Sequence, residues 1–214
     1  MSTLYLGLDP SRFVTRNRLV HVPLIRTVKR DFSHGEIGAV FHDLPSYTHI
    51  VFLSRRGVRY FFACAALYGG MEKVGAEIIA IGEGTAALLR TYVNRPFEVA
   101  ASATQEGVIA TLAKKRLRYV LVPCSARSRP DLTAFLVRTG VRHQVCFLYD
   151  TYPLKPKEEI NISAFDEIVF TGPSVVDAFC RFFGPLPPED RSVPIGPVTK
   201  NVMDLYRKGG VLPA

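Results

Sequence analysis

Several short polar turns in this sequence stand where a strand pattern gives way to a helix pattern, and their residue types suit anion binding. They are Ser54-Arg55, Gly82 to Thr85, Thr171 to Ser174 and Gly196 to Thr199. The first turn of a helix has unpaired backbone N–H groups and a partial positive charge. Glycine, serine and threonine let a ligand approach that backbone, and the hydroxyl groups add donors. The turns therefore predict sites for carboxylate or phosphate groups.

An ordinary capping role explains any one of these turns on its own, because serine, threonine and glycine begin helices in many proteins. Their duplication favours binding. The segment IVFLSRRGVRYFF is followed by IAIGEGTAALL, and IVFTGPSVVDAFC is followed by VPIGPVTKNVM. Each pair has the pattern strand, polar turn and helix, repeated once. Both halves of the chain are therefore expected to follow one plan.

The elements that must position these turns are strands and helices in alternation. From Thr48 onward the strands HIVFL, EIIAI, FEVAA and RYVLVP are each followed by a helical segment. Such alternation predicts β-α-β units and a parallel sheet. Thr104 is placed to cap the helix that begins near Gln105, and Gly140 to end a later one. Ligands of parallel sheets bind beyond the carboxyl ends of the strands, where all these turns fall.

Extended segments interrupt the alternation twice, around Pro23 and after Gly140. The β-α units that remain at the end of the chain are too few for a core of their own, so they are expected to recruit the N-terminal strand LYLGL. We predict an α/β fold of two similar parallel-sheet lobes joined by two extended connectors, one lobe being discontinuous in sequence. Residues 1–22 and 152–214 form one domain, residues 32–146 the inserted one, and 23–31 and 147–151 the connectors. The polar turns of the two lobes are expected to face a common cleft.

Composition sets limits on the function. The 214 residues are 48% hydrophobic and 21% charged, which is typical of a folded globule. The formal net charge of +8 attracts anions, and on charge alone nucleic acid stays an alternative ligand. The basic residues are scattered in ones and twos, however, without the stripe expected of a nucleic-acid binder.

Several other classes of site and location are disfavoured. The cysteines and histidines show no metal, redox or catalytic-triad spacing, and GEGTA is too short for a dinucleotide fingerprint. Neither a metal nor a cofactor is expected. The N-terminal segment MSTLYLGLDP does not resemble a secretory signal, and no apolar stretch is long enough to span a membrane. A cytoplasmic location without a membrane partner follows as the expectation.

The order of the motifs resembles the uroporphyrinogen-III synthase family. The matching segments are FLSRRGV, IGEGTA, VPCSARSRPDLTAFLVRTG, FLYDT, FTGPSVV and IGPVTK. Arg55-Arg56 and Gly172 replace the family's commoner Ser-Pro pattern, and Lys200 stands where alanine is usual. The resemblance implies a hydro-lyase of heme biosynthesis that cyclises hydroxymethylbilane to uroporphyrinogen III, with loss of water and inversion of ring D. It implies no metal or cofactor.

The resemblance also implies site residues. Tyr149, in FLYDT, matches the tyrosine of the family's V-Y-x-T motif, and a phenol can act as a general acid. The alternative is a half-buried connector aromatic with its hydroxyl in water. Arginines in the polar turns are expected to pair with substrate carboxylates. The full set of expected substrate-binding residues is Arg12, Ser54, Arg55, Gly82, Thr85, Thr104, Ser125, Arg127, Thr171, Ser174, Gly196 and Thr199.

A non-catalytic alternative stays open at this point: a two-domain anion-binding or sensor protein with the same fold, because a fold does not fix a function. Under the catalytic hypothesis the partner is a polycarboxylate tetrapyrrole, handed over from hydroxymethylbilane synthase. A monomer that binds neither nucleic acid nor membrane is expected.

Overall fold

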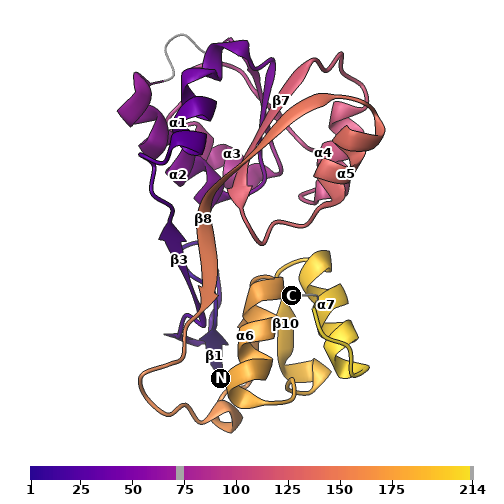
Figure 1. The fold of residues 1–214 in the computed structure, drawn as a ribbon. Helices are drawn as coiled ribbons and strands as arrows, with labels where there is room; N and C mark the ends of the chain where they lie inside the picture. The colour runs from indigo at the N-terminus through magenta and orange to yellow at the C-terminus, as the bar shows by residue number, and fades with distance from the viewer. Residues whose placement is uncertain (71–74, 213–214) are drawn as a thin grey trace. The chain divides into compact units, whose positions relative to one another are not determined.

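A computed structural model describes residues 1–70 and 75–212 of the chain. The chain divides into two compact units. Unit 1 consists of Met1–Thr27 and Thr151–Ala214, and unit 2 of Val28–Asp150. Each unit has a sheet with helices packed on it (Figure 1). The predicted α/β class with parallel sheets is confirmed.

Unit 2 contains most of a six-stranded sheet with the order β3-β8-β7-β4-β5-β6. Strand β4 lies at its centre and pairs in parallel with both β5 and β7. All of its residues are buried, as expected of a strand covered on both faces. The strand bounds are β3 Ile25–Lys29, β4 His49–Phe52, β5 Glu77–Ala80, β6 Glu98–Val99, β7 Tyr119–Ser125 and β8 Arg142–Pro153.

Helices cover both faces of this sheet (Figure 1). Ile50 and Phe52 of β4 belong to the core shared with helices α1, α2 and α3. Val51, between them, belongs to the core shared with α4 and α5, because alternate side chains of a strand point to opposite faces. The helix bounds are α1 Gly35–His42, α2 Arg55–Ala65, α3 Glu83–Leu89, α4 Gln105–Leu112 and α5 Asp131–Arg138.

The strand order of unit 2 reverses beside β4. From β4 the chain moves to β5 and then β6 on one side, and it returns to place β7 and β8 on the other. In an open α/β sheet such a switch point opens a crevice beyond the carboxyl ends of the two strands, where ligands bind. The turn at Ser54 follows β4, and a second turn follows Ser125, the last residue of β7.

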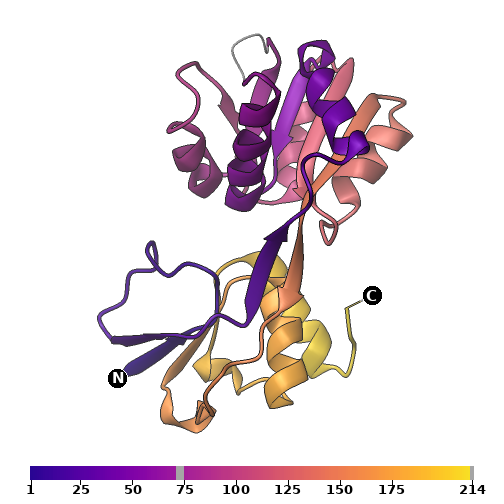
Figure 2. The same ribbon diagram turned by 60° about the vertical axis from the view of Figure 1, so that its left-hand side comes forward.

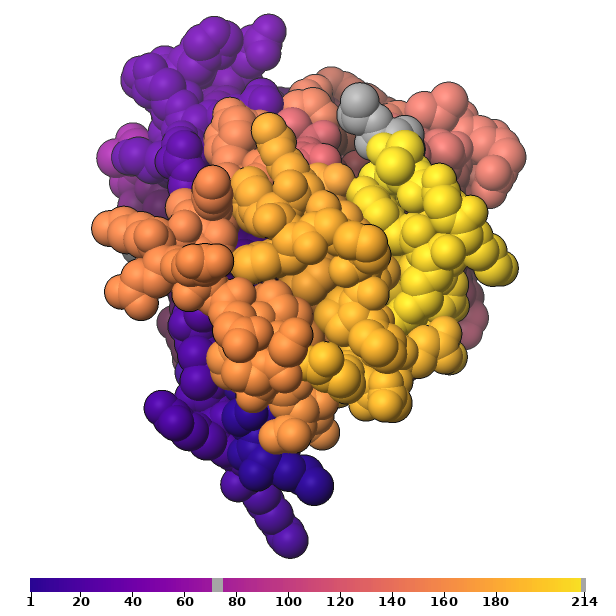
Figure 3. Space-filling view, turned by 90° about the horizontal axis from the view of Figure 1, so that it is seen from below, coloured from indigo at the N-terminus to yellow at the C-terminus, as the bar shows by residue number. Residues whose placement is uncertain are grey.

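Unit 1 has a smaller parallel sheet with the order β10-β9-β1-β2. Leu4, Ile168 and Phe170 pack on its helices α6 and α7 in one core. Figure 3 shows α6 in gold beside α7 in yellow on one face of the protein. The bounds are β1 Ser2–Tyr5, β2 Arg18–His21, β9 Glu167–Phe170, α6 Pro173–Phe183, β10 Ser192–Pro194 and α7 Pro197–Arg207.

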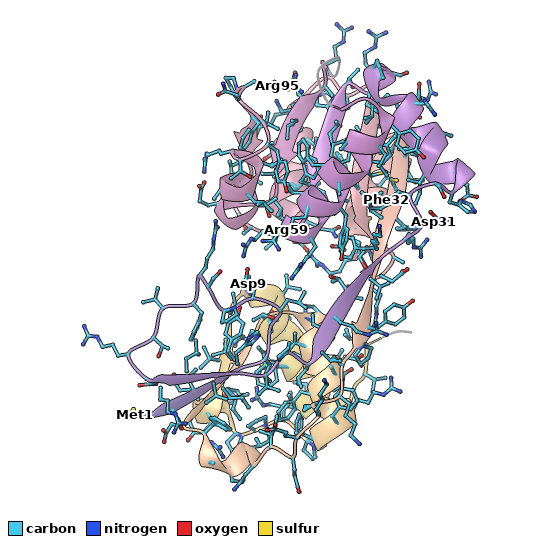
Figure 4. The ribbon with its side chains drawn as sticks, turned by 90° about the vertical axis from the view of Figure 1, so that its left-hand side faces the viewer. Met1, Asp9, Asp31, Phe32, Arg59 and Arg95 are labelled. Atoms are coloured by element: carbon cyan, nitrogen blue, oxygen red, sulfur yellow. The ribbon has the colours of Figure 1, made fainter. Side chains whose placement is uncertain are left out.

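The connection from β1 to β2 is irregular. Residues 6–17, all of which the structure describes, contain no helix or strand (Figure 2, indigo coil). The ring of Tyr5 packs on Phe13 at 5.4 Å between centroids, and its hydroxyl donates to the carbonyl oxygen of Asp9, which Figure 4 labels. The coil thus packs against the end of β1.

The structure differs from the sequence prediction in a few elements. Helix α1 was not predicted, because His34 makes no side-chain cap and the helix contains Gly35 and Gly38. It is stabilised instead by burial of its apolar face, as short helices usually are. The segment around Pro23, for which Pro23 left an edge strand or an extended connector open, holds the end of β2 and all of β3, and each is an edge strand of its sheet. Short 3₁₀ helices cover Leu44–Ser46, Ala66–Tyr68, Ile162–Ala164 and Glu189–Arg191.

Candidate substrate-binding and catalytic site

The turn from β4 to α2 is the first component of the site. Ser54 has extended backbone angles, and its Oγ accepts a hydrogen bond of 2.9 Å from the backbone N–H of Gly57. Gly57 is required for close packing, because a Cβ there would lie 2.9 Å from the carbonyl oxygen of Pro123 in β7. In the described chain the first turn of α2 carries Arg55 and Arg56 and no acidic residue. This helix start therefore has a positive potential.

Tyr149 is the second component, and β8 delivers it by a break in its register. Cys124 of β7 is opposite Phe147, but Ser125 is opposite Tyr149, so Leu148 is an extra residue. Leu148 and Tyr149 both belong to the core on the α1–α3 face, although consecutive side chains of a regular strand point to opposite faces. A bulge re-aims a side chain in this way.

The hydroxyl of Tyr149 lies 2.9 Å from the Oγ of Ser54, and its ring stacks on Tyr60 with centroids 4.9 Å apart. Only 6% of Tyr149 is exposed. The side chain is therefore buried rather than half-buried, and its hydroxyl is bonded to protein. Burial raises the pKa of Tyr149, while the hydrogen bond with Ser54 and the charge of Arg56 oppose that shift. At neutral pH the group is a protonated phenol.

The turn after β7 lies beside Tyr149. The Oγ of Ser125, a buried residue, accepts a hydrogen bond of 3.2 Å from the backbone N–H of Arg127. The N–H of Ala126 donates to the carbonyl oxygen of Tyr149 at 3.4 Å. Ser125 thus shapes this turn, while the side chain of Arg127 is exposed. Of the pair, Arg127 is the residue placed to reach a ligand.

The starts of α3 and α4 differ from that of α2, because each carries an acidic residue. Glu83, in the first turn of α3, pairs with Arg90. Glu106, in the first turn of α4, pairs with Arg129 at 3.0 Å, and that hydrogen bond lowers the pKa of Glu106 to about 2. These carboxylates already interact with the helix dipoles. A ligand carboxylate is therefore expected to prefer α2 over α3 or α4.

The remaining predicted residues of these two turns have structural roles. Thr104 caps α4, since its Oγ1 accepts a hydrogen bond of 3.2 Å from the N–H of Gly107. Thr85 is buried in α3. Gly82 is also buried, and a Cβ there would lie 2.7 Å from the Cβ of Ala103. Gly82 is thus a close-approach position between neighbouring turns.

Unit 1 has its own switch point, between β1 and β9. Thr171 follows β9 and packs so closely on Gly7 that a Cβ on Gly7 would lie 2.5 Å from the Thr171 Cγ2 atom. Helices α6 and α7 begin at Pro173 and Pro197, and in the described chain neither has an acidic residue in its first turn.

The other predicted residues of unit 1 vary in exposure. Ser174 and Gly196 are partly exposed, whereas Thr199 is buried. Arg12 is exposed on the coil after β1. Thr199 is therefore a packing residue of α7, and the other three have surface to offer a ligand.

Sequence reasoning missed two residues near these turns. Tyr60 supports the ring of Tyr149, but nothing in RGVRYFF distinguishes it from a core aromatic. His21, at the carboxyl end of β2, has its Nε2 2.8 Å from the carbonyl oxygen of Gly7. In the sequence, no possible partner lies at a recognisable spacing from this histidine. The parallel pairing of β1 and β2 brings His21 beside the end of β1, and the sequence does not reveal this pairing.

A hollow of about 240 Å³ in unit 2 does not coincide with these turns. Its lining residues include Asp31, labelled in Figure 4, together with Arg30, His34, Glu36, Ile37, Val40, Gln144, Val145, Cys146 and Phe147. None of the predicted site residues is among them. The described residues also form no cluster of metal-ligating side chains, and within 1–70 and 75–212 no helix has the length and apolar character of a membrane span.

A comparison with protein families decides the relationship. The model of the family described as uroporphyrinogen-III synthase HemD matches residues 18–207. The chain belongs to the uroporphyrinogen-III synthase family. It is therefore placed among the enzymes of tetrapyrrole and heme biosynthesis.

Solved structures agree with the family at the level of the fold. A mutant uroporphyrinogen III synthase of Thermus thermophilus is 18% identical, with a TM-score of 0.66 over 98% of this chain and 90% of that one. The synthase of Helicobacter pylori is 17% identical, with a TM-score of 0.55 over 98% and 90% of the two chains. Among curated protein sequences no match is found.

Proposed function

We propose that this chain is the hydro-lyase that converts hydroxymethylbilane to uroporphyrinogen III. The reaction closes a linear tetrapyrrole into a ring, with loss of water and inversion of ring D. Family membership supports the proposal, and so does a set of helix starts suited to the acetate and propionate groups on every pyrrole of the substrate.

The proposed binding role falls on the positive turns. Arg55 lies at the start of α2, and Arg127 in the turn that follows β7. Arginine binds carboxylates in a bidentate manner, which orients as well as attracts them. The starts of α6 and α7 in unit 1 offer backbone N–H groups, and Arg12 adds a further positive charge to that unit. Positioning of a flexible chain is the larger part of such catalysis.

The proposed chemistry begins with the departure of the substrate hydroxyl group. The bond between the hydroxymethyl carbon and its oxygen breaks, both electrons leave with the oxygen, and a proton from Tyr149 makes the leaving group water. The electron pair of the pyrrole nitrogen stabilises the carbocation. The last pyrrole attacks this cation through its substituted α-carbon, which forms a spiro intermediate. The older bond from that carbon to the bridge of the neighbouring pyrrole then breaks, and the free α-carbon of the last pyrrole attacks the cation left on that bridge, which inverts the ring. The proton lost when the ring becomes aromatic again restores the phenol, so the steps balance.

A single observation carries the catalytic assignment. At the switch point of unit 2, a buried phenol, protonated at neutral pH, is hydrogen-bonded to the residue that begins the positive end of α2. A non-catalytic anion-binding protein does not require a buried proton donor at such a place. The arrangement therefore favours the enzyme over the sensor.

Freshly made hydroxymethylbilane tests the proposal directly. The purified protein is expected to yield uroporphyrinogen III, identified by chromatography of the oxidised product. Formation of isomer I alone, which is the product of uncatalysed closure, would reject the proposal and favour the non-catalytic alternative. Tight binding of hydroxymethylbilane without turnover would do the same.

A further inference from the structure

The Oγ of Ser54 makes two hydrogen bonds, and the direction of its proton depends on which group donates in the second one. It accepts from the N–H of Gly57 at 2.9 Å, and it lies 2.9 Å from the hydroxyl of Tyr149. A serine hydroxyl has one proton and two lone pairs. Since the N–H of Gly57 has no other role than donor, the question is which hydroxyl donates in the second bond.

The start of α2 favours donation by Ser54. The bond from Gly57 polarises the Ser54 O–H group and makes it a stronger donor, because hydrogen bonds in a chain reinforce one another. The positive end of α2, with Arg55 and Arg56, also favours negative charge on the oxygen of Tyr149. It disfavours the other arrangement, in which the phenol proton points at Ser54. The chain of donors then runs from Gly57 to Ser54 to Tyr149, and the phenol proton points outward from it.

We propose that Ser54 is a positioning residue for Tyr149: its hydroxyl donates to the phenol oxygen, directs the phenol proton toward the departing hydroxyl of the substrate, and stabilises the phenolate after transfer. This rests on the proposed function and changes the role of Ser54 from a substrate contact to a support. Stacking on Tyr60 fixes the ring of Tyr149. The phenol proton can then change direction only by rotation about the bond between the ring and its oxygen, and the hydrogen bond from Ser54 restricts this rotation.

The charged and titratable groups that act on Tyr149 come from the elements packed on it. They are Arg56 and Tyr60 of α2 and Cys124 of β7. None of them is altered by a change at Ser54, and Ser54 itself carries no charge. A change in the ionisation of Tyr149 after substitution of Ser54 therefore reports the loss of one hydrogen bond.

A measurement without substrate tests whether the hydroxyl of Ser54 stabilises the phenolate of Tyr149. The protein is labelled with a fluorinated tyrosine whose phenol ionises below the pH of base unfolding, and Tyr149 is assigned in the ¹⁹F NMR spectrum with Tyr149→Phe. Ser54→Ala is expected to raise the ionisation midpoint of Tyr149, whereas Ser54→Thr, which keeps the hydroxyl, is expected to leave it in place. An unchanged or lower midpoint in Ser54→Ala would overturn the proposal.

Thr104→Ala is the matched control for this titration. Thr104 caps α4 as Ser54 caps α2, each accepting from the N–H three residues later, but only Ser54 reaches Tyr149. The Thr104 variant is expected to lose a similar cap contribution while the Tyr149 midpoint stays in place. If it moved the midpoint as much as Ser54→Ala does, loss of a cap would explain both and the proposal would fall.

The kinetics of hydroxymethylbilane conversion are the second test of the proposal. Ser54→Ala is expected to lower kcat about tenfold with little change in KM, as for removal of one hydrogen bond used in the transition state. Ser54→Thr is expected to restore most of the rate. In the Tyr149→Phe background Ser54→Ala should cost almost nothing further, and a full additional loss there would refute the positioning role.

The two tests separate this proposal from the proposed function. If the protein did not convert hydroxymethylbilane at all, the proposed function would fail, while the NMR titration would still report whether Ser54 supports the phenolate. If conversion were normal and Ser54→Ala shifted neither the titration nor kcat, only the role of Ser54 would be wrong.

Discussion

The hydroxyl of Tyr149 lies 2.9 Å from the Oγ of Ser54, a residue 95 positions earlier in the chain. Two independent features produce this contact. A bulge in β8 turns Tyr149 to the face of the sheet that α2 covers, and Gly57 lets α2 approach β7 closely. The contact therefore depends on backbone details at both ends, and it places a protonated phenol at the switch point of unit 2.

Tyr149→Phe tests the role of the phenol. Without the proton donor, water must protonate the leaving hydroxyl, while the electron-rich pyrrole still stabilises the cation. We expect kcat to fall about 10- to 100-fold without being abolished. Tyr152→Phe, at an exposed tyrosine later in the same strand, is the control and should keep the normal rate. A normal rate in Tyr149→Phe would show that the general acid is another group.

Arg55→Gln tests carboxylate binding at the start of α2. Loss of a charge-assisted hydrogen bond weakens binding by about 1.5–3 kcal/mol, so KM is expected to rise roughly tenfold or more. If the contact is the same in ground and transition states, kcat should change little. Arg138→Gln removes the same charge from the last turn of α5. An equal rise of KM in both variants would indicate a general effect of net charge instead of a contact at α2.

Gly57→Ala tests the close packing of α2 on β7. The new methyl group would lie 2.9 Å from the carbonyl oxygen of Pro123 and 3.4 Å from the Oγ of Ser54. Since backbone must move to make room, we expect a loss of about 1–3 kcal/mol in the free energy of unfolding. Denaturant unfolding of the purified variant measures this loss.

Gly35→Ala is the control for that substitution. Gly35 is the first residue of α1, and a Cβ there would meet nothing within 4 Å. Alanine in a helix stabilises relative to glycine by about 0.5–1 kcal/mol. Destabilisation of both variants to the same degree would show that the packing argument for Gly57 is wrong.

Much of the fold follows from sequence patterns. The strands HIVFL and EIIAI and the helices after them were predicted because apolar runs alternate with amphipathic segments and glycines mark the ends. Gly140 does have a positive φ angle, as predicted for a helix end. Helix α1 escaped because its stability comes from tertiary burial, which a capless sequence with two glycines does not reveal.

The site was less predictable, for a physical reason. The composition of a turn indicates where a helix starts, but it does not distinguish the cap Ser54 from the cap Thr104. The two have similar sequence patterns, and only Ser54 has a distant partner, Tyr149. That partner depends on the β8 bulge, and one extra residue in a strand leaves no signal in the alternation of a buried segment. The sequence does show, however, that α3 and α4 carry an acidic residue in their first turns. This difference from α2 could have been predicted.

His49 predicts how stability depends on pH. It is 4% exposed at the start of β4, and burial lowers its pKa, with Lys115 adding to the shift and Glu77 opposing it. The unfolded state, in which a histidine has a pKa near 6.5, therefore binds more protons than the folded state as the pH falls. The contribution of His49 to stability is fully present above about pH 6.5, and it is lost as the pH falls below that value toward the folded-state pKa.

The free energy of unfolding should therefore fall between about pH 7.5 and about pH 5.5, a window that lies above the titration of ordinary carboxylates. His49→Leu is expected to flatten this dependence, because the uncharged apolar side chain fits the buried position and binds no proton. His34→Leu, at an exposed histidine before α1, controls for loss of an imidazole and should keep the slope of the unaltered protein. Denaturant titrations at several pH values measure the slopes. A His49→Leu variant as pH-dependent as the unaltered protein would mean that the acid sensitivity arises elsewhere in the fold.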